Sequence, residues 1–364
     1  MDTARLDQAR AALRRHGVDA LLVGPSADLR YLVGYHALPL ERLTLLVVPA
    51  EGDPLLIVPA LEEPRARDSG ADQLVTLTSF TETEDPVALV VEHLEAADAT
   101  ARLAVQDRLW TAFTLALQGA IPAAAWVPGS SIMRELRLVK SSQEIGALRE
   151  VGAAIDAVHA QVPGLLRVGR TEAEVGRDIS ELILREHDEV NFVIVASGPN
   201  GASPHHETGG RRLEQGDAVV VDIGGTRAGY CSDMTRNYVV GEPPGGYAEL
   251  HRVLEEAQDA AVAAVAPGVA AGVIDRVARE HIADAGYGEY FVHRTGHGIG
   301  VEEHEEPWIV EGNDLVLEPG MAFSVEPGIY VPDRYGARIE DIVVVTDDGV
   351  ERLNLRPREV LVAG

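Results

Sequence analysis

The C-terminal part of the chain carries residues whose types and spacing could hold two metal ions. The set consists of four acids and one imidazole: Asp222, Asp233, His297, Glu326 and Glu340. Asp222 follows the apolar run Val219–Val221, and the two glutamates lie among apolar residues and glycine turns. Carboxylates in such strands cost free energy on burial unless an opposite charge accompanies them. Four converging carboxylates would repel one another, and two divalent cations would cancel that repulsion.

The ligand types also indicate what chemistry the site performs. Oxygen-rich sites with one imidazole suit manganese, cobalt, iron or zinc better than a structural zinc, which prefers cysteine and histidine. Two ions held about 3.5–4 Å apart activate a bridging water and polarise a carbonyl oxygen. Each acid alone could be a turn residue or a solvated strand residue. All five in apolar, glycine-flanked contexts favour a hydrolytic metal centre.

Other polar residues around the five ligands are candidates for contact with a substrate. His293 and His304 flank His297 in a glycine-rich segment. A zinc-binding helix is not expected there, because glycine disfavours helices. His205 and His206 lie in a loop rich in proline and glycine, and either could donate a hydrogen bond to a substrate or to a tetrahedral oxyanion. A structural or surface role is the alternative for each histidine.

Two further charged residues are assigned from their place beside the ligands. Glu326 could serve both as a metal ligand and as the acceptor of the proton of the attacking water. Arg338 lies two residues before Glu340, so on a strand the two side chains share a face. An arginine there either neutralises the acids or binds a substrate carboxylate. Asp341 follows Glu340 directly, so its side chain should point to the other face of the strand, away from the metals.

Composition restricts the class of protein. A length of 364 residues favours two domains, and a hydrophobic content of 46% is ample for their cores. The longest apolar runs are far shorter than the roughly 18 residues of a membrane span, and the first residues read as an amphipathic helix rather than a signal peptide. A single cysteine, Cys231, indicates the cytoplasm. The net charge of −27 disfavours nucleic acid and anionic membranes as partners.

The chain changes character near Pro128, which predicts domains over residues 1–127 and 128–364. The first contains short apolar runs between amphipathic stretches, typical of a small α/β domain: 21–23, 45–48, 55–58 and 103–105. In the second, capping boxes at Ser141 and Thr171 open two helices, and two more are expected over 246–265 and 271–285. Two hairpin-like units, each with two of the acids, suggest a duplicated half-domain.

At these motifs the chain resembles the prolidase and aminopeptidase P branch of the M24 metallopeptidases, which have the pita-bread fold. The resemblance extends from about residue 140 to 350 and rests on an ordered set of motifs: VVVDIGG, CSDMTR, HRTGHGIG with VEEHEEP, SVEPGIY and GARIED. It implies an α+β fold, with a C-terminal pita-bread domain built on a curved antiparallel sheet and preceded by a smaller α/β domain of the creatinase N-terminal type. None of the five ligand positions departs from the pattern.

The resemblance also implies a role for each site residue. Asp222 would chelate one metal, and Asp233 and Glu340 would bridge both. His297 and Glu326 would complete the ligands of the other metal, and Glu326 would also be catalytic. The family's substrate-contacting histidines and its active-site arginine match four further positions: His205, His293, His304 and Arg338.

These observations predict a cytoplasmic metallopeptidase with two divalent metal ions, manganese favoured and cobalt, zinc or iron as alternatives. The predicted reaction is hydrolysis of the imide bond before proline by a metal-bridging hydroxide. A proline-containing dipeptide is favoured as substrate, which makes the protein an Xaa-Pro dipeptidase (prolidase). An Xaa-Pro aminopeptidase (aminopeptidase P) acting on longer peptides is the alternative. A non-catalytic binding protein on the same fold is a remote one, because such relatives lose their ligands.

The resemblance implies a homodimer as well. In proteins of this architecture a loop from the partner's N-terminal domain usually closes the substrate pocket. Residues 35–42 are the expected loop, from their position in the chain.

Overall fold

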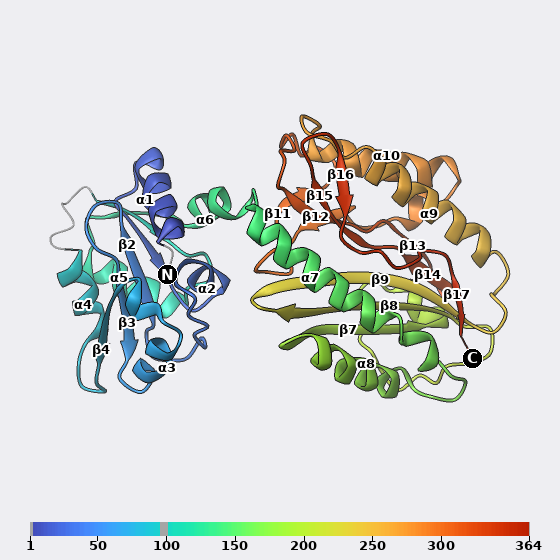
Figure 1. Ribbon diagram of the computed structural model, residues 1–364, viewed down its shortest axis with the longest axis horizontal. Helices are drawn as coiled ribbons and strands as arrows, with labels where there is room; N and C mark the ends of the chain where they lie inside the picture. Colours follow the sequence, from blue (N-terminus) through green and yellow to red (C-terminus); the bar gives the residue numbers. More distant parts are fainter. Residues whose placement is uncertain (1–2, 95–100, 364) are drawn as a thin grey trace. The chain divides into compact units, whose positions relative to one another are not determined.

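The computed structural model describes residues 3–94 and 101–363, which form two compact units (Figure 1). One unit extends to Arg137 and the other begins at Leu138. The boundary predicted from the sequence, between residues 127 and 128, lies before helix α6 (Ser130–Arg137), which belongs to the first unit. Within the described residues, no helix combines the length and the apolar character needed to cross a membrane.

The N-terminal unit is built on a mixed six-stranded sheet in the order β4-β3-β2-β1-β5-β6. Its strands are short: β1 (Ala20–Val23), β2 (Leu45–Pro49), β3 (Leu55–Pro59), β4 (Thr76–Phe80), β5 (Arg102–Val105) and β6 (Ala125–Pro128). The apolar runs predicted β1, β2, β3 and β5. They did not predict β4, in which most side chains are polar, or β6, a four-residue apolar strand whose side chains are exposed or only partly buried.

Six helices among the described residues accompany this sheet: α1 (Ala4–His16), α2 (Ala27–Val33), α3 (Glu63–Asp68), α4 (Pro86–His93), α5 (Thr111–Ala120) and α6. Apolar side chains of α4 and α5 meet those of the sheet in one core, in which Leu22, Val47, Val90 and Leu117 are fully buried. Burying a side chain of this size contributes roughly 1.5–3 kcal/mol. The unit therefore has a core of its own.

The C-terminal unit contains a four-stranded sheet (β17-β9-β8-β7), a five-stranded sheet (β11-β10-β12-β15-β16) and the hairpin β13-β14. The strands of the first sheet are β7 (Glu189–Ser197), β8 (Ala218–Arg227), β9 (Tyr230–Val240) and β17 (Leu361–Ala363). Those of the second are β10 (Gly296–Gly298), β11 (Glu305–Ile309), β12 (Ala322–Val325), β15 (Asp341–Val345) and β16 (Val350–Arg352). The hairpin is β13 (Gly328–Val331) and β14 (Tyr335–Arg338).

Four helices cover these sheets: α7 (Ser142–His159), α8 (Glu172–Glu186), α9 (Tyr247–Ala263) and α10 (Ala271–Asp284). Both predicted capping boxes are present, at Ser141 and Thr171, and α9 and α10 begin and end close to the predicted bounds. α7 and α8 pack on the four-stranded sheet, whereas α9 and α10 pack against β12, β13, β14 and β15. The predicted helices over a largely antiparallel sheet are confirmed (Figure 1).

The two predicted hairpin-like units are both present. β8 and β9 are joined by a tight turn in which Ala228 and Gly229 have positive φ angles of 49° and 84°. β13 and β14 pair antiparallel between the two glutamates, with Gly328 opposite Arg338. Each hairpin thus brings two acids close together that are separated along the chain.

Candidate metal centre

The β8–β9 hairpin places both aspartates on one face of the sheet. Thr235 lies directly opposite Asp222, and Gly224 lies opposite Asp233. Residues two apart on a strand share a face, and so do residues directly opposite each other. Asp222 and Asp233 therefore point the same way. Adding a Cβ atom at Gly224 would bring it within 2.7 Å of the Ser232 carbonyl oxygen, so this position has no room for a side chain.

The other three candidate ligands reach the same place from the ends of different strands. His297 Nε2 lies 3.2 Å from Glu326 Oε1 and 3.8 Å from Asp233 Oδ2. One ligand atom each of Asp233, His297 and Glu340 lies within 4.8 Å of the other two. Thr235 Oγ1 donates to Glu340 Oε2 over 2.8 Å and so fixes this carboxylate beside the hairpin. The five residues selected from the sequence are brought together, and their role as ligands remains a prediction.

Three of these carboxylates have a buried oxygen without a hydrogen bond. They are Asp222 Oδ1, Asp233 Oδ1 and Glu340 Oε1, for which the described residues supply no partner. A buried acceptor without a partner costs about 1–3 kcal/mol, and more when it is charged. Three such oxygens in one cluster, two from neighbouring strands and one from the segment between β14 and β15, fit a cation site. The residues present therefore fit the divalent ions that the sequence implies.

Mutual repulsion is visible in the pKa values of the acids. Burial, followed by the nearby carboxylates of Glu340 and Asp222, raises the pKa of Asp233 well above its usual value. Burial and the carboxylate of Glu326 raise the pKa of Glu340 in the same way. Burial also opposes ionisation of Glu326, but its hydrogen bond to His297 and the charges of His297, His293 and Arg338 together outweigh burial and lower the pKa to about 2. Of these three acids, Glu326 keeps its charge most readily.

Arg338, whose side chain is buried, donates a hydrogen bond to one of these acids. Nη2 donates to Asp222 Oδ2 over 2.5 Å, Nε donates to Thr235 Oγ1, and Nη1 donates to the Tyr330 hydroxyl and the Pro204 carbonyl. Of the two roles left open by the sequence, neutralising the acids matches these contacts. Asp341, predicted to point away, bonds instead to Arg236, Arg352 and Gln258.

His293 belongs to a hydrogen-bonded chain that begins at Arg338. Its Nδ1 donates to the Arg294 carbonyl over 2.6 Å, so in the neutral ring Nε2 is an acceptor, and Tyr330 Oη lies 2.8 Å from it. Burial lowers the pKa of His293 and raises that of Tyr330 to about 12, which keeps both groups neutral. Tyr330 is not among the residues selected from the sequence. Its place in the SVEPGIY motif, four residues after Glu326, is the signal that could have indicated it.

The other histidines divide into two groups. The ring of His304 lies 4.1 Å from that of His297, and burial lowers its pKa to about 4. His205 lies close enough to His293 and His304 to contribute to the lowering of their pKa values. His206 turns elsewhere: its Nε2 donates to Glu172 Oε2 over 2.8 Å. His206 therefore binds a buried acid, and this contact does not match the predicted contact with a substrate.

Helix α10 holds the segment that leads to the histidines. Asp275, fully buried, accepts from the backbone nitrogen of Thr295 over 2.9 Å and binds Arg279 with both oxygens. Arg279 in turn donates to the carbonyls of Phe291 and His293. Because these bonds fix backbone on both sides of His293, the histidine is held by a packed helix rather than by a free loop.

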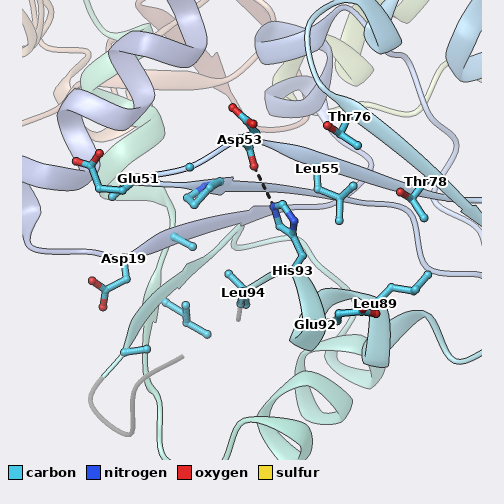
Figure 2. Close-up of a pocket in the computed structure, with 16 residues that line it drawn as sticks. Asp19, Glu51, Asp53, Leu55, Thr76, Thr78, Leu89, Glu92, His93 and Leu94 are labelled. Atoms are coloured by element: carbon cyan, nitrogen blue, oxygen red, sulfur yellow. Dashed lines mark hydrogen bonds between the residues drawn. The ribbon is translucent and has the colours of Figure 1, made fainter. Parts of the chain in front are cut away.

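A cavity of about 870 Å³ lies elsewhere, in the N-terminal unit beside β1 and β3 (Figure 2). Asp19, Glu51, Thr76 and Glu92 are among its lining residues, and His93 Nε2 donates to the Asp53 carbonyl at its edge. None of the candidate ligands lines this cavity. Residues 95–100, which follow the lining residue Leu94 in the sequence, lie outside the described part of the chain, so no site is assigned there.

Comparison with known proteins places these features in a family. Residues 146–347 match the model of metallopeptidase family M24, and residues 5–139 match that of the creatinase/prolidase N-terminal domain. A probable dipeptidase PepE of Mycobacterium bovis is 50% identical over 361 residues, covering 98% of this chain and 96% of the relative. An Xaa-Pro dipeptidase of Lactobacillus helveticus is 37% identical over 351 residues, covering 94% and 95%.

The fold agrees with these relatives. The crystal structure of a prolidase from Thermococcus sibiricus superposes with a TM-score of 0.94 at 36% identity, covering 100% of this chain and 99% of that one. The predicted architecture, a smaller α/β domain before a pita-bread domain with curved sheets, is therefore confirmed.

Metal binding should release protons and so strengthen with pH. The raised pKa values of Asp233 and Glu340 mean that both groups stay protonated in the metal-free folded protein. In the unfolded chain the same groups lose their protons above about pH 4. The free energy of unfolding of the metal-free protein therefore falls as the pH rises above that value. Bound metal replaces the protons. We expect Mn²⁺ at about 100 times its Kd to add roughly 2.7 kcal/mol of stability. At fixed total Mn²⁺, the rise in Tm should be larger near pH ~8 than near pH ~5.5 by scanning calorimetry.

Two variants control this experiment. Glu340→Gln removes one predicted bridging acid and should abolish the metal-dependent rise in Tm, and Glu311→Gln, an exposed acid outside the centre, should keep it. Equal metal-dependent shifts in Glu340→Gln and the wild-type protein would contradict the assignment of ligands.

Proposed function

The chain belongs to metallopeptidase family M24, and from that premise we propose that it is a two-metal Xaa-Pro dipeptidase that hydrolyses the bond between a first residue and a following proline. The observation that carries the proposal is the buried group of converging acids with three unsatisfied oxygens. Five residues would hold the ions: Asp222, Asp233, His297, Glu326 and Glu340. Bound there, two divalent ions polarise a carbonyl and lower the pKa of water.

The protein's own side chains then have distinct tasks in the reaction. Glu326, whose pKa is about 2, is ionised and can accept the proton of the attacking water on a carboxylate oxygen, then pass it to the prolyl nitrogen. His205 and His304 would donate to the oxygen that becomes negative during attack. His293, held by Tyr330 and its own Nδ1 bond, would orient the prolyl end of the substrate.

Arg294 supports the choice of a dipeptide as substrate. Its guanidinium lies 4.4 Å above the ring of Trp308, and it has no hydrogen bond or ion pair with any described residue. The residue is half-buried, and burial lowers its pKa, while Glu326 is near enough to act on its charge. A partly desolvated cation beside the reacting groups can bind the free carboxylate of a dipeptide, whereas a longer peptide has an amide there.

The remaining parts of the proposal rest on family resemblance and composition. Manganese is the favoured ion, with cobalt, zinc or iron as alternatives, because the ligand set is rich in oxygen. A homodimer is favoured, and Leu38 and Leu40 of the expected partner-facing segment 35–42 are 47% and 37% exposed. A cytoplasmic location follows from the single cysteine. An aminopeptidase acting on longer peptides stays the alternative, and the intact ligand set disfavours a non-catalytic binding protein.

Turnover of simple peptides tests the proposal. The purified protein, stripped of metal and reloaded in turn with Mn²⁺, Co²⁺ or Zn²⁺, should release proline from Ala-Pro and be much slower on Ala-Pro-Ala. The rates can be followed by chromatography of the products. Faster cleavage of Ala-Pro-Ala would establish the aminopeptidase instead, and no cleavage of either peptide with any of these metals would refute both.

Replacement of Arg294 tests the preference for a free carboxylate. Arg294→Gln should lower kcat/KM for Ala-Pro by about 10- to 100-fold, as expected for the loss of a charge-assisted hydrogen bond. The kcat/KM for Ala-Pro-amide, which has no free carboxylate, should stay nearly unchanged. Arg334→Gln, an exposed arginine on the β13–β14 turn, is the matched control. Equal losses on the acid and the amide would show that Arg294 does not bind the carboxylate.

A further inference from the structure

Glu172, in the first turn of α8, is a fully buried acid whose hydrogen bonds all go to one segment. Its Oε1 accepts from the backbone nitrogen of Ser197 over 2.8 Å, from the Ser197 hydroxyl over 2.7 Å and from Asn200 Nδ2 over 3.0 Å. Its Oε2 accepts from His206 Nε2 over 2.8 Å and from the backbone nitrogen of Gly209 over 3.3 Å. One carboxylate thus ties together residues 197–209 of the connection between β7 and β8.

This connection carries His205, and a second element holds it on the other side. Arg338 Nη1 donates to the carbonyl of Pro204 over 3.2 Å, while Glu172 binds His206. Both neighbours of His205 are therefore anchored, one to the strand that precedes Glu340 and the other to helix α8. The direction in which the His205 ring can point is limited by these two bonds.

Close packing of backbone makes the same connection intolerant of displacement. The turn Gly198–Ala202 packs on β14, and a Cβ atom added at Gly336 would lie only 2.0 Å from the Gly201 carbonyl oxygen. Two glycines facing each other allow this approach, which brings the connection against the strand that leads to Glu340. If the connection moved, β14, which leads to Glu340, would have to move with it.

The charge of Glu172 is part of this arrangement. Burial alone would raise its pKa, but the hydrogen bonds from Ser197, Asn200 and His206 outweigh burial and lower the pKa. An ionised carboxylate accepts more strongly than a neutral amide, so the five bonds depend on the charge.

We propose that Glu172 is a positioning residue of the reaction, which fixes the β7–β8 connection so that His205 reaches the substrate beside the metal centre. The role of His205 rests on the proposed function, whereas the anchoring by Glu172 does not. Glu172 touches neither the candidate ligands nor the reacting atoms, and it acts only through the segment 197–209. An error in placement on the order of 1 Å in a group that contacts the transition state can lower a rate about 100-fold.

Kinetics of Glu172→Gln test this role, with Glu174→Gln as the matched control. Glu174 lies in the same helical turn and completes the capping box with Thr171, but among the described residues its side chain has no hydrogen bond to the segment 197–209. We expect Glu172→Gln to lower kcat/KM for Ala-Pro by about 10- to 100-fold with the metal content unchanged, and Glu174→Gln to stay within about twofold. In a His205→Ala background, Glu172→Gln should have almost no further effect. Independent, multiplying effects of the two changes would overturn the proposal.

A measurement that needs no turnover separates this inference from the proposed function. Amide hydrogen exchange over residues 197–209 should be about tenfold faster in Glu172→Gln than in the wild-type protein and in Glu174→Gln. Unchanged exchange would overturn the anchoring role even if the wild-type enzyme cleaves Ala-Pro. Accelerated exchange in a protein without Xaa-Pro activity would refute the proposed function and the role of His205, and would leave only the anchor.

A milder pair of variants covers the case in which Glu172→Gln does not fold. His206→Gln keeps a side-chain donor that can reach Glu172, and His206→Ala removes it. The glutamine variant should retain most of the kcat/KM for Ala-Pro and the exchange protection, and the alanine variant should lose both. Equal behaviour of the two would contradict the anchoring role.

Discussion

Electrostatic repulsion within a buried cluster of acids is the constraint on which the C-terminal unit depends. Asp222, Asp233, Glu326 and Glu340 bring four negative charges when ionised, and Arg338 brings one positive charge, which leaves three uncompensated. At the short distances of a protein interior such an excess is strongly unfavourable. The raised pKa values of Asp233 and Glu340 are the response of the metal-free site, and divalent cations are the response that the family implies.

The rest of the unit can be understood as the scaffold that keeps these acids together. Two hairpins bring paired acids to one face, and buried groups outside the cluster fix the segments between them. Asp275 and Arg279 hold the backbone around His293, Glu172 holds the connection that carries His205, and Thr235 holds Glu340. Each of these contacts joins residues of different elements, so the geometry of the site is set by the packing of α8 and α10 as much as by the strands.

Much of the candidate site could be predicted from the sequence, because its strongest signals are local. A carboxylate after a β-branched run, an alternation that puts Arg338 and Glu340 on one face, and capping boxes at Ser141 and Thr171 all depend on residues close together in the chain. The strand β4 was not predicted because most of its side chains are polar, and β6 was not predicted because its apolar run is only four residues long and ends in proline.

What the sequence could not provide are contacts between distant segments. His206 lies 34 residues from its partner Glu172, and Arg338 lies 134 residues from the Pro204 carbonyl. Nothing near His206 distinguishes it from His205, yet one faces a buried acid and the other lies near His293 and His304. Tyr330 was overlooked for the same reason, since its value lies in its hydrogen bonds to His293 and Arg338.

The presence of two metal ions can be tested by an anomalous-difference map from crystals of the Mn²⁺-loaded protein, collected at the manganese absorption edge. We expect two peaks about 3.5–4 Å apart, with Asp233 and Glu340 between them and with Asp222, His297 and Glu326 at their outer sides. A map without peaks at this cluster, or one in which these side chains turn apart and contact solvent, would contradict this expectation.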